Sequence, residues 1–251
     1  MNVAALWWLL PLFFVAAFVY SSVGHGGGSA YLALMALTTL PQQTIRSTSL
    51  VLNIVVAVAG FISYHRAQHF QWRLLLPFAI GSVPAAFFGG LRLLSPKAFS
   101  VVLGVTLLLS AARLALMNRP VQAHAHLSDR TLWMFGPPIG VALGLLAGMV
   151  GVGGGIFLSP LLLFLGWADT KKTAAVSAAF ILVNSISGLI AQMQKTQLGW
   201  DLIVPSALVV LVAGTIGSRL GANRFSPLWL QRLLAVVLVT ASAKLLMQAA
   251  K

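Results

Sequence analysis

The chain has 251 residues, of which 59% are hydrophobic and 8% are charged, and its formal net charge is +13. About 25% of the residues of a soluble domain are charged, so the composition excludes a soluble protein and predicts a polytopic all-α membrane protein. The 16 Lys and Arg residues are dispersed along the chain. This dispersion excludes a nucleic-acid-binding protein and suits helix ends that contact lipid headgroups.

Two long charge-free runs, 1–45 and 131–168, each begin one half of the chain. Three apolar segments follow each run, close to the ~20 residues that a membrane-spanning helix needs. These predicted spans are Ser47–Tyr64, Leu74–Leu91, Ala98–Met117, Thr173–Met193, Leu202–Ser218 and Leu228–Met247. The chain therefore divides into an N-terminal transmembrane repeat (1–117), a polar linker (118–130) and a C-terminal transmembrane repeat (131–251).

The two halves share residues at a nearly constant spacing. Gly153 follows Gly26 by 127 residues, and Trp200 follows Trp72 by 128. The pairs Pro77 with Pro205 and Gly89 with Gly217 also keep the spacing of 128. A fixed spacing over a long stretch indicates an internal repeat, so we interpret the chain as a duplicated unit.

Three consecutive glycines interrupt each charge-free run, in "VGHGGG" (23–28) and "VGVGGG" (150–155). Each glycine costs a helix about 1 kcal/mol relative to alanine, so each run is predicted to be a helix, a break and a shorter helix. The shorter helices are predicted at 29–40 and 156–165. The first amides of a helix lack partners and carry the positive end of its dipole, so two breaks at the membrane midplane predict an anion site. The alternative is that the glycines only allow close helix packing.

Polar residues near the breaks are the candidates for binding a substrate. Ser49 and Asn53 share one helix face, as do Ser177 and Asn184. Each Asn is equally well explained as an interhelical hydrogen-bonding group. His25 is the only group inside a charge-free run that ordinarily titrates near neutral pH, and it is a candidate proton carrier or hydrogen-bond donor. The predicted substrate-binding set is Gly26, Gly27, Gly28, Ser29, Gly153, Gly154, Gly155, Ser49, Asn53, Ser177, Asn184 and His25.

Charged residues stand at the ends of the predicted spans. Four of them are candidates for attracting an anion, with interfacial anchoring as the alternative: Arg46, Arg92, Lys172 and Arg219. The three acids, Asp129, Asp169 and Asp201, all lie at span ends, which argues against a cation pathway. The absence of cysteine excludes a thiolate metal site, and His65 and His69 have no carboxylate or cysteine nearby, so no metal site is predicted. No nucleotide-binding motif and no His/Asp/Glu or Ser/His constellation at a useful spacing is present, so no cofactor or enzymatic activity is predicted.

The distribution of Lys and Arg favours one topology. If each glycine segment is a re-entrant hairpin beside three spanning helices, the second half is inverted and ten cations face one side. The other side then holds Arg46, Arg92, Lys97, Lys195, Lys244 and Lys251. If each glycine segment instead crossed the membrane once, eight Lys and Arg residues would lie on each side. Cytoplasmic loops are enriched in Lys and Arg, so we expect the inverted arrangement, with both termini on the less basic, periplasmic face.

The segments "VGHGGGSAYLALMAL" and "GMVGVGGGIFLSPLLLFLG", over a stretch from about Tyr20 to Met247, resemble the TauE/SafE sulfite exporter family. This family is also described as four-toluene-sulfonate uptake permeases. The resemblance implies a multi-pass inner-membrane carrier for a small sulfur-containing anion such as sulfite or a sulfonate, and it allows a homodimer. The chain departs from strict repetition where His25 corresponds to Val152. Alternatives are a channel-like permease for another small anion and a non-transporting membrane subunit.

Overall fold

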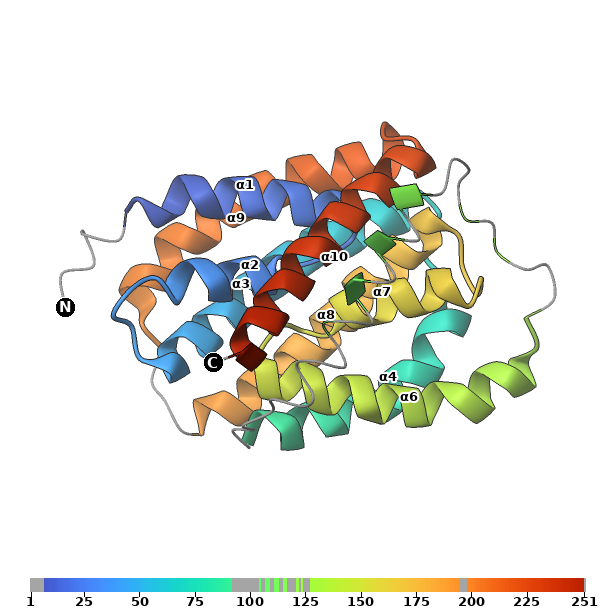
Figure 1. Cartoon of the computed structure of the whole chain (residues 1–251), viewed down its shortest axis with the longest axis horizontal. Coiled ribbons are helices and arrows are strands. Elements are labelled where there is room, and N and C mark those ends of the chain that lie inside the picture. Colours follow the sequence, from blue (N-terminus) through green and yellow to red (C-terminus); the bar gives the residue numbers. More distant parts are fainter. Residues whose placement is uncertain are drawn as a thin grey trace.

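The computed structural model describes residues 7–91, 104, 107–108, 111–112, 115–116, 121, 123, 127–194 and 198–250. These residues form helices joined by short turns, and none of them lies in a strand (Figure 1). The helices are α1 (Leu9–Ser22), α2 (Gly28–Met35), α3 (Gln42–Arg66), α4 (Trp72–Leu91), α6 (Asp129–Val150), α7 (Gly155–Phe164), α8 (Thr170–Met193), α9 (Trp200–Asn223) and α10 (Pro227–Ala250).

Five of the described helices are long and apolar enough to cross a membrane, namely α3, α4, α6, α8 and α9. Four of the predicted spans lie within α3, α4, α8 and α9, and a fifth lies within α10, whose apolar part is Pro227–Thr240. The remaining predicted span, Ala98–Met117, falls mostly outside the described residues. These helices confirm a multi-pass, all-helical membrane protein.

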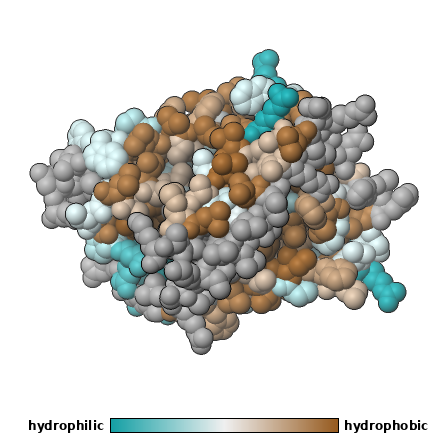
Figure 2. Space-filling model, viewed as in Figure 1, coloured by the Kyte–Doolittle hydropathy of each residue, from teal (hydrophilic) through white to brown (hydrophobic). Residues whose placement is uncertain are grey.

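The exterior of the bundle is apolar. Figure 2 shows hydrophobic side chains over most of the face that is not grey, with hydrophilic ones near its margins. Phe88 and Leu208 point outward with exposed fractions of 61% and 62%. Because lipid tails solvate such side chains as well as a protein core does, this surface suits a bilayer.

Glycines bring the backbones of two helix pairs into direct contact. On α6, Gly140 and Gly144 lie against α4, where an added Cβ would come within 2.2 Å of the Phe78 and Ser82 carbonyl oxygens. On α9, Gly221 lies equally close to α1, with its added Cβ 2.1 Å from the Ser22 oxygen. Small residues spaced in this way are the usual means of close helix packing in membranes. Close packing through glycine therefore also occurs at positions outside the two triple-glycine segments.

The helix pairs exchange partners between the two halves of the chain. α1, from the first half, packs along α9, from the second, while α6 packs along α4. The corresponding helices α3 and α8 pack against each other between these two pairs (Figure 1). The core is thus built jointly by both halves.

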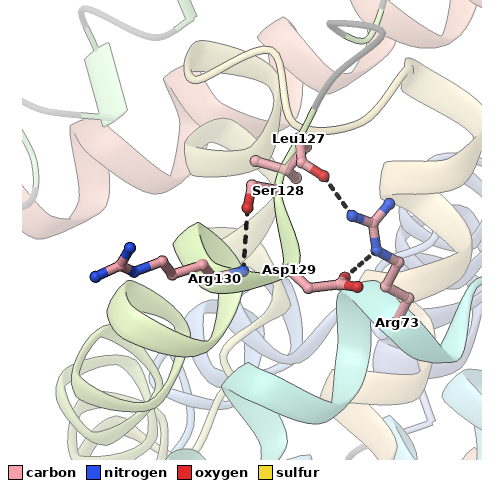
Figure 3. Close-up of polar contacts among 5 residues, drawn as sticks. All are labelled: Arg73, Leu127, Ser128, Asp129 and Arg130. Atoms are coloured by element: carbon pink, nitrogen blue, oxygen red, sulfur yellow. Dashed lines mark hydrogen bonds and ion pairs between the residues drawn. The ribbon is translucent and has the colours of Figure 1, made fainter.

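One end of the bundle is tied together by polar contacts (Figure 3). Arg73, at the start of α4, forms an ion pair with Asp129, at the start of α6, and donates to the Leu127 carbonyl. The Ala222 carbonyl, near the end of α9, lies 3.0 Å from the Nζ of Lys171 and 3.2 Å from the Nε2 of His69. The ends of α3 and α9 and the starts of α4, α6 and α8 therefore lie at the same end of the molecule.

Candidate anion-binding site

Each charge-free run consists of two helices separated by a glycine turn, as predicted. α1 ends at Ser22 and α2 begins after Gly27, whose φ is +90°. α6 ends at Val150 and α7 begins after Gly154, whose φ is +82°. Residues with a side chain rarely adopt positive φ, so glycine is required at both turns. The helix α7 agrees with the prediction, but α2 ends at Met35 rather than at residue 40.

The early end of α2 has a local cause. The hydroxyl of Thr38 donates to the Met35 carbonyl over 2.6 Å and accepts from the amide of Leu40. Threonine side chains that bond the nearby backbone compete with helix continuation, and Pro41 follows directly. The chain therefore turns at 36–40 before it enters α3.

The turns present free amides inside the protein. Neither Gly27 nor Gly154 can cap its helix with a side chain. Among the described residues, the amides of 26–28 and of 153–155 have no hydrogen-bond acceptor. Both turns are buried, and bare amides at a helix N-terminus favour an anion. This is the local chemistry that the sequence predicts.

Asn53, on α3, lies directly against the first turn. A Cβ on Gly26 would come 2.4 Å from its Oδ1, and a Cβ on Gly28 would come 2.3 Å from its Nδ2. Asn53 is fully buried, and neither the Oδ1 nor the Nδ2 of its side chain has a hydrogen-bond partner among the residues that the structure describes. A buried amide without partners costs free energy, so this side chain is available to a ligand at the turn.

The second turn meets an apolar side chain in the corresponding position. Ile181 follows Asn53 by 128 residues, and it lies 2.8 Å from an added Cβ on Gly153 and 2.4 Å from one on Gly155. Asn184 lies one turn further along α8 and donates to the Phe180 carbonyl of its own helix over 2.8 Å. The two half-sites are therefore chemically unequal at Asn53 and Ile181, as they are at His25 and Val152.

Ser49 connects the two turns. Its hydroxyl lies 3.2 Å from the Gly28 carbonyl oxygen and 3.3 Å from that of Gly151. The hydroxyl of Ser177, its counterpart in the repeat, instead pairs with that of Ser159 at 2.6 Å and joins α7 to α8. The hydroxyl of Ser29 lies 3.0 Å from that of Tyr20. Among these serines only Ser49 touches both breaks.

His25 lies in the first turn and is 3% exposed. Its Nδ1 lies 3.2 Å from the Val23 carbonyl oxygen, and its Nε2 has no partner among the described residues. The ring stands edge-on to Tyr20, with 6.5 Å between the ring centroids. One nitrogen of the ring is therefore held by the first turn, and the other is left without a partner in the part of the chain that the structure describes.

Arg46 is the one candidate cation that lies beside a glycine turn. It is 4% exposed, and its Nη2 donates to the carbonyls of Gly148, at 2.9 Å, and Met149. These carbonyls end α6, where a cation is favoured by the helix dipole. Within the part of the chain that the structure describes, its Nε has no partner and its guanidinium forms no ion pair. The guanidinium is therefore a buried positive charge that no carboxylate neutralises.

The other three candidate cations are placed differently. Lys172 pairs with Asp169 at 3.3 Å, and Arg219 is exposed on α9. Arg92 lies outside the described residues. The structure thus brings neither Lys172 nor Arg219 to the turns.

Tyr31 is a site residue that sequence reasoning missed. It is fully buried, and its hydroxyl has no hydrogen-bond partner in the described part of the chain. That oxygen would lie 2.7 Å from a Cβ on Gly27. Side chains of a helix tilt toward its N-terminus. A tyrosine one turn after a helix start is therefore placed to reach back over the first amides, and this spacing was the available signal.

Buried glycine turns inside a bundle of membrane-spanning helices define a class of protein, since broken helices of this kind line the binding sites of repeat-built membrane transporters. The chain matches the sequence model of the family described as "Sulfite exporter TauE/SafE" over residues 9–245, and it belongs to this family. It is accordingly a membrane transporter rather than an enzyme.

Several curated relatives cover nearly the whole chain. A "Probable membrane transporter protein y4hK" of Sinorhizobium fredii is 34% identical over 93% of this chain and 95% of its own length. The "Probable sulfite/organosulfonate exporter TauE" of Cupriavidus necator is 27% identical over 96% of both chains. A "Probable membrane transporter protein YunE" of Bacillus subtilis is 27% identical over 85% of this chain and 86% of its own. No solved structure matches the chain.

Proposed function

We propose that the protein is a secondary transporter of the inner membrane that exports a small sulfur oxyanion, such as sulfite or a sulfonate. The anion binds at the membrane midplane between the two glycine turns. The observation that carries this proposal is the contact of Ser49 with Gly28 and Gly151, because it brings the two breaks to one place. The Cupriavidus relative named as a sulfite and organosulfonate exporter supports the substrate class.

The groups around the turns favour an anion over a cation. Free amides, the Nδ2 of Asn53 and the hydroxyl of Tyr31 can all donate hydrogen bonds. Arg46 supplies a buried positive charge. All three acids of the chain lie at helix ends away from the turns, where two of them pair with Arg73 and Lys172. A tetrahedral or pyramidal oxyanion has several acceptor oxygens and suits this set of donors.

We further propose that α1–α2 and α6–α7 are re-entrant hairpins of two inverted repeats. The exchange of partners supports this proposal, since α1 packs on α9 as its counterpart α6 packs on α4. The basic residues Arg66, Arg73, Lys171 and Arg224 lie near the helix ends that meet at one end of the bundle. An excess of Lys and Arg marks the cytoplasmic side, so this end faces the cytoplasm.

A transport assay with the purified protein in proteoliposomes tests the proposal. We expect uptake of radiolabelled sulfite to saturate and to accelerate when the vesicles are preloaded with unlabelled sulfite. Substitution of Asn53 by Ile, the residue of the second half-site, should abolish both effects. Flux that neither saturates nor exchanges would indicate a channel-like permease. The absence of flux for sulfite and sulfonates, with the protein folded, would contradict the proposed substrate class.

A further inference from the structure

We propose that His25 is the proton-binding group of the transporter, so that each sulfur oxyanion is bound together with one proton. This inference rests on the proposed function and adds the coupling ion to it. The starting point is the contact of its Nδ1 with the Val23 carbonyl oxygen at 3.2 Å. A carbonyl oxygen can only accept a hydrogen bond, so the Nδ1 of the ring carries a hydrogen.

This tautomer determines what the other nitrogen can do. In the neutral ring the Nε2 then has a lone pair and no hydrogen. The Nε2 is buried and has no partner among the described residues. A buried lone pair that no donor satisfies is a site for a proton or for an acidic hydrogen of a ligand. The second glycine turn is close to the first, since a Cβ on Gly26 would come 3.2 Å from the Cγ2 of Ile181 and a Cβ on Gly153 would come 2.8 Å from the same atom.

The titratable and charged groups on the elements around His25 place no free acid beside it. They are Tyr20 of α1, Tyr31 of α2, Arg46, Tyr64, His65 and Arg66 of α3, Lys171 and Lys172 of α8 with Asp169 at its N-cap, and Asp201 and Arg219 of α9 with Arg224 directly after it. Asp169 pairs with Lys172, and Asp201 begins α9, about 30 Å along the helix from Gly221, which packs on Ser22. α7 carries no titratable side chain. Because no carboxylate faces the ring, a positive charge on His25 gains a counter-charge only when an anion is bound. Binding of the proton and of the anion therefore favour each other.

The proton balance differs between two kinds of substrate. A sulfonate has only acceptor oxygens, which a bare lone pair on Nε2 repels, so the proton must come from water before or during binding. Hydrogen sulfite brings its own proton, which can pass from the anion to Nε2. In both cases one Nε2–H bond forms on loading and breaks on release, and the proton leaves with the anion.

One substitution at position 25 distinguishes the roles of the two ring nitrogens. Asparagine at position 25 keeps an N–H near the position of Nδ1 for the Val23 carbonyl but has no titrating nitrogen. His69 provides the matched control, because its Nε2 contacts the Ala222 carbonyl at 3.2 Å and it lies in the turn between α3 and α4. The substitutions are therefore His25→Asn, His25→Gln as a second variant, and His69→Asn.

Titration calorimetry with methanesulfonate is the test, because this sulfonate stays ionised and cannot itself release or take up a proton. Binding is measured in two buffers of different ionisation enthalpy, from about pH 5 to pH 8. The wild type and His69→Asn should take up about one proton per anion in the upper part of this range, and their affinity should fall about tenfold per pH unit there. The two His25 variants should show no proton uptake and no such dependence.

Two results would overturn the inference: proton uptake that persists in both His25 variants, or wild-type binding without proton uptake. A folded protein that binds no methanesulfonate at any pH would instead contradict the proposed function for sulfonates, so the two failures are distinguishable.

Discussion

Replacing Gly27 by alanine should destabilise the protein, whereas the same change at Gly60 should not. Gly27 has a φ of +90°, and an added Cβ would come 2.7 Å from the Cζ and hydroxyl of Tyr31. The left-handed conformation costs a residue with a Cβ about 1–2 kcal/mol, and overpacking costs about 1–3 kcal/mol. Tyr31 is fully buried and has little room to move. We therefore expect Gly27→Ala to lower the free energy of unfolding by about 2–5 kcal/mol.

Gly60 is the matched control within the same protein. It lies in the middle of α3, and an added Cβ would meet the Ala178 methyl at 3.5 Å, an ordinary contact. Alanine there should stabilise the helix by about 0.5–1 kcal/mol. Unfolding of both variants is followed by tryptophan fluorescence in detergent, at increasing temperature and denaturant. Gly27→Ala unfolding no more easily than Gly60→Ala would refute the argument that backbone geometry requires glycine at the turn.

Two further substitutions test separate contacts. Arg46→Met removes the charged donor from the end of α6. Hydrogen bonds to charged groups contribute about 1.5–3 kcal/mol each, so this substitution should lower the free energy of unfolding by about 3 kcal/mol. It should also weaken anion binding. The control Arg219→Met, at an exposed position, should change the free energy of unfolding by less than about 0.5 kcal/mol. If Arg46→Met and Arg219→Met had equal effects in denaturant unfolding and in calorimetry, a special role for Arg46 would be contradicted. Asp169 caps α8 by accepting from the Lys172 amide at 2.9 Å, so Asp169→Ala should cost about 1 kcal/mol and leave the affinity for methanesulfonate unchanged. A large loss of affinity would show that α8 acts on the site through its first turn.

The local features of the site could be predicted from the sequence. The glycine turns were predictable because three consecutive glycines cannot continue a helix, and Ser49 and Asn53 because polar residues on one face of an apolar helix are rare. Those signals are carried by residues that are close in the chain. They fix where a helix breaks and which side chains share a face.

The features of the site and fold that the sequence did not predict depend on contacts between residues far apart in the chain. The sequence alone favoured an interfacial anchor for Arg46, because its place at the end of α6 depends on how α3 packs against the other half. That Ile181, and not Asn184, faces the second turn follows from the register of α8, which hydrophobic periodicity does not fix. The pairing of α1 with α9 is likewise a result of backbone contact at Gly221.

Crystals soaked with selenite test most directly the claim that a sulfur oxyanion binds between the two turns, because selenium gives an anomalous signal that locates the ion. The account predicts a single strong peak within about 4 Å of the Nδ2 of Asn53 and of the amides of 26–28. Crystals of the Asn53→Ile variant should lack this peak. A peak only among the exposed cations near Arg219, or no peak in crystals of a protein that binds sulfite in solution, would contradict the claim.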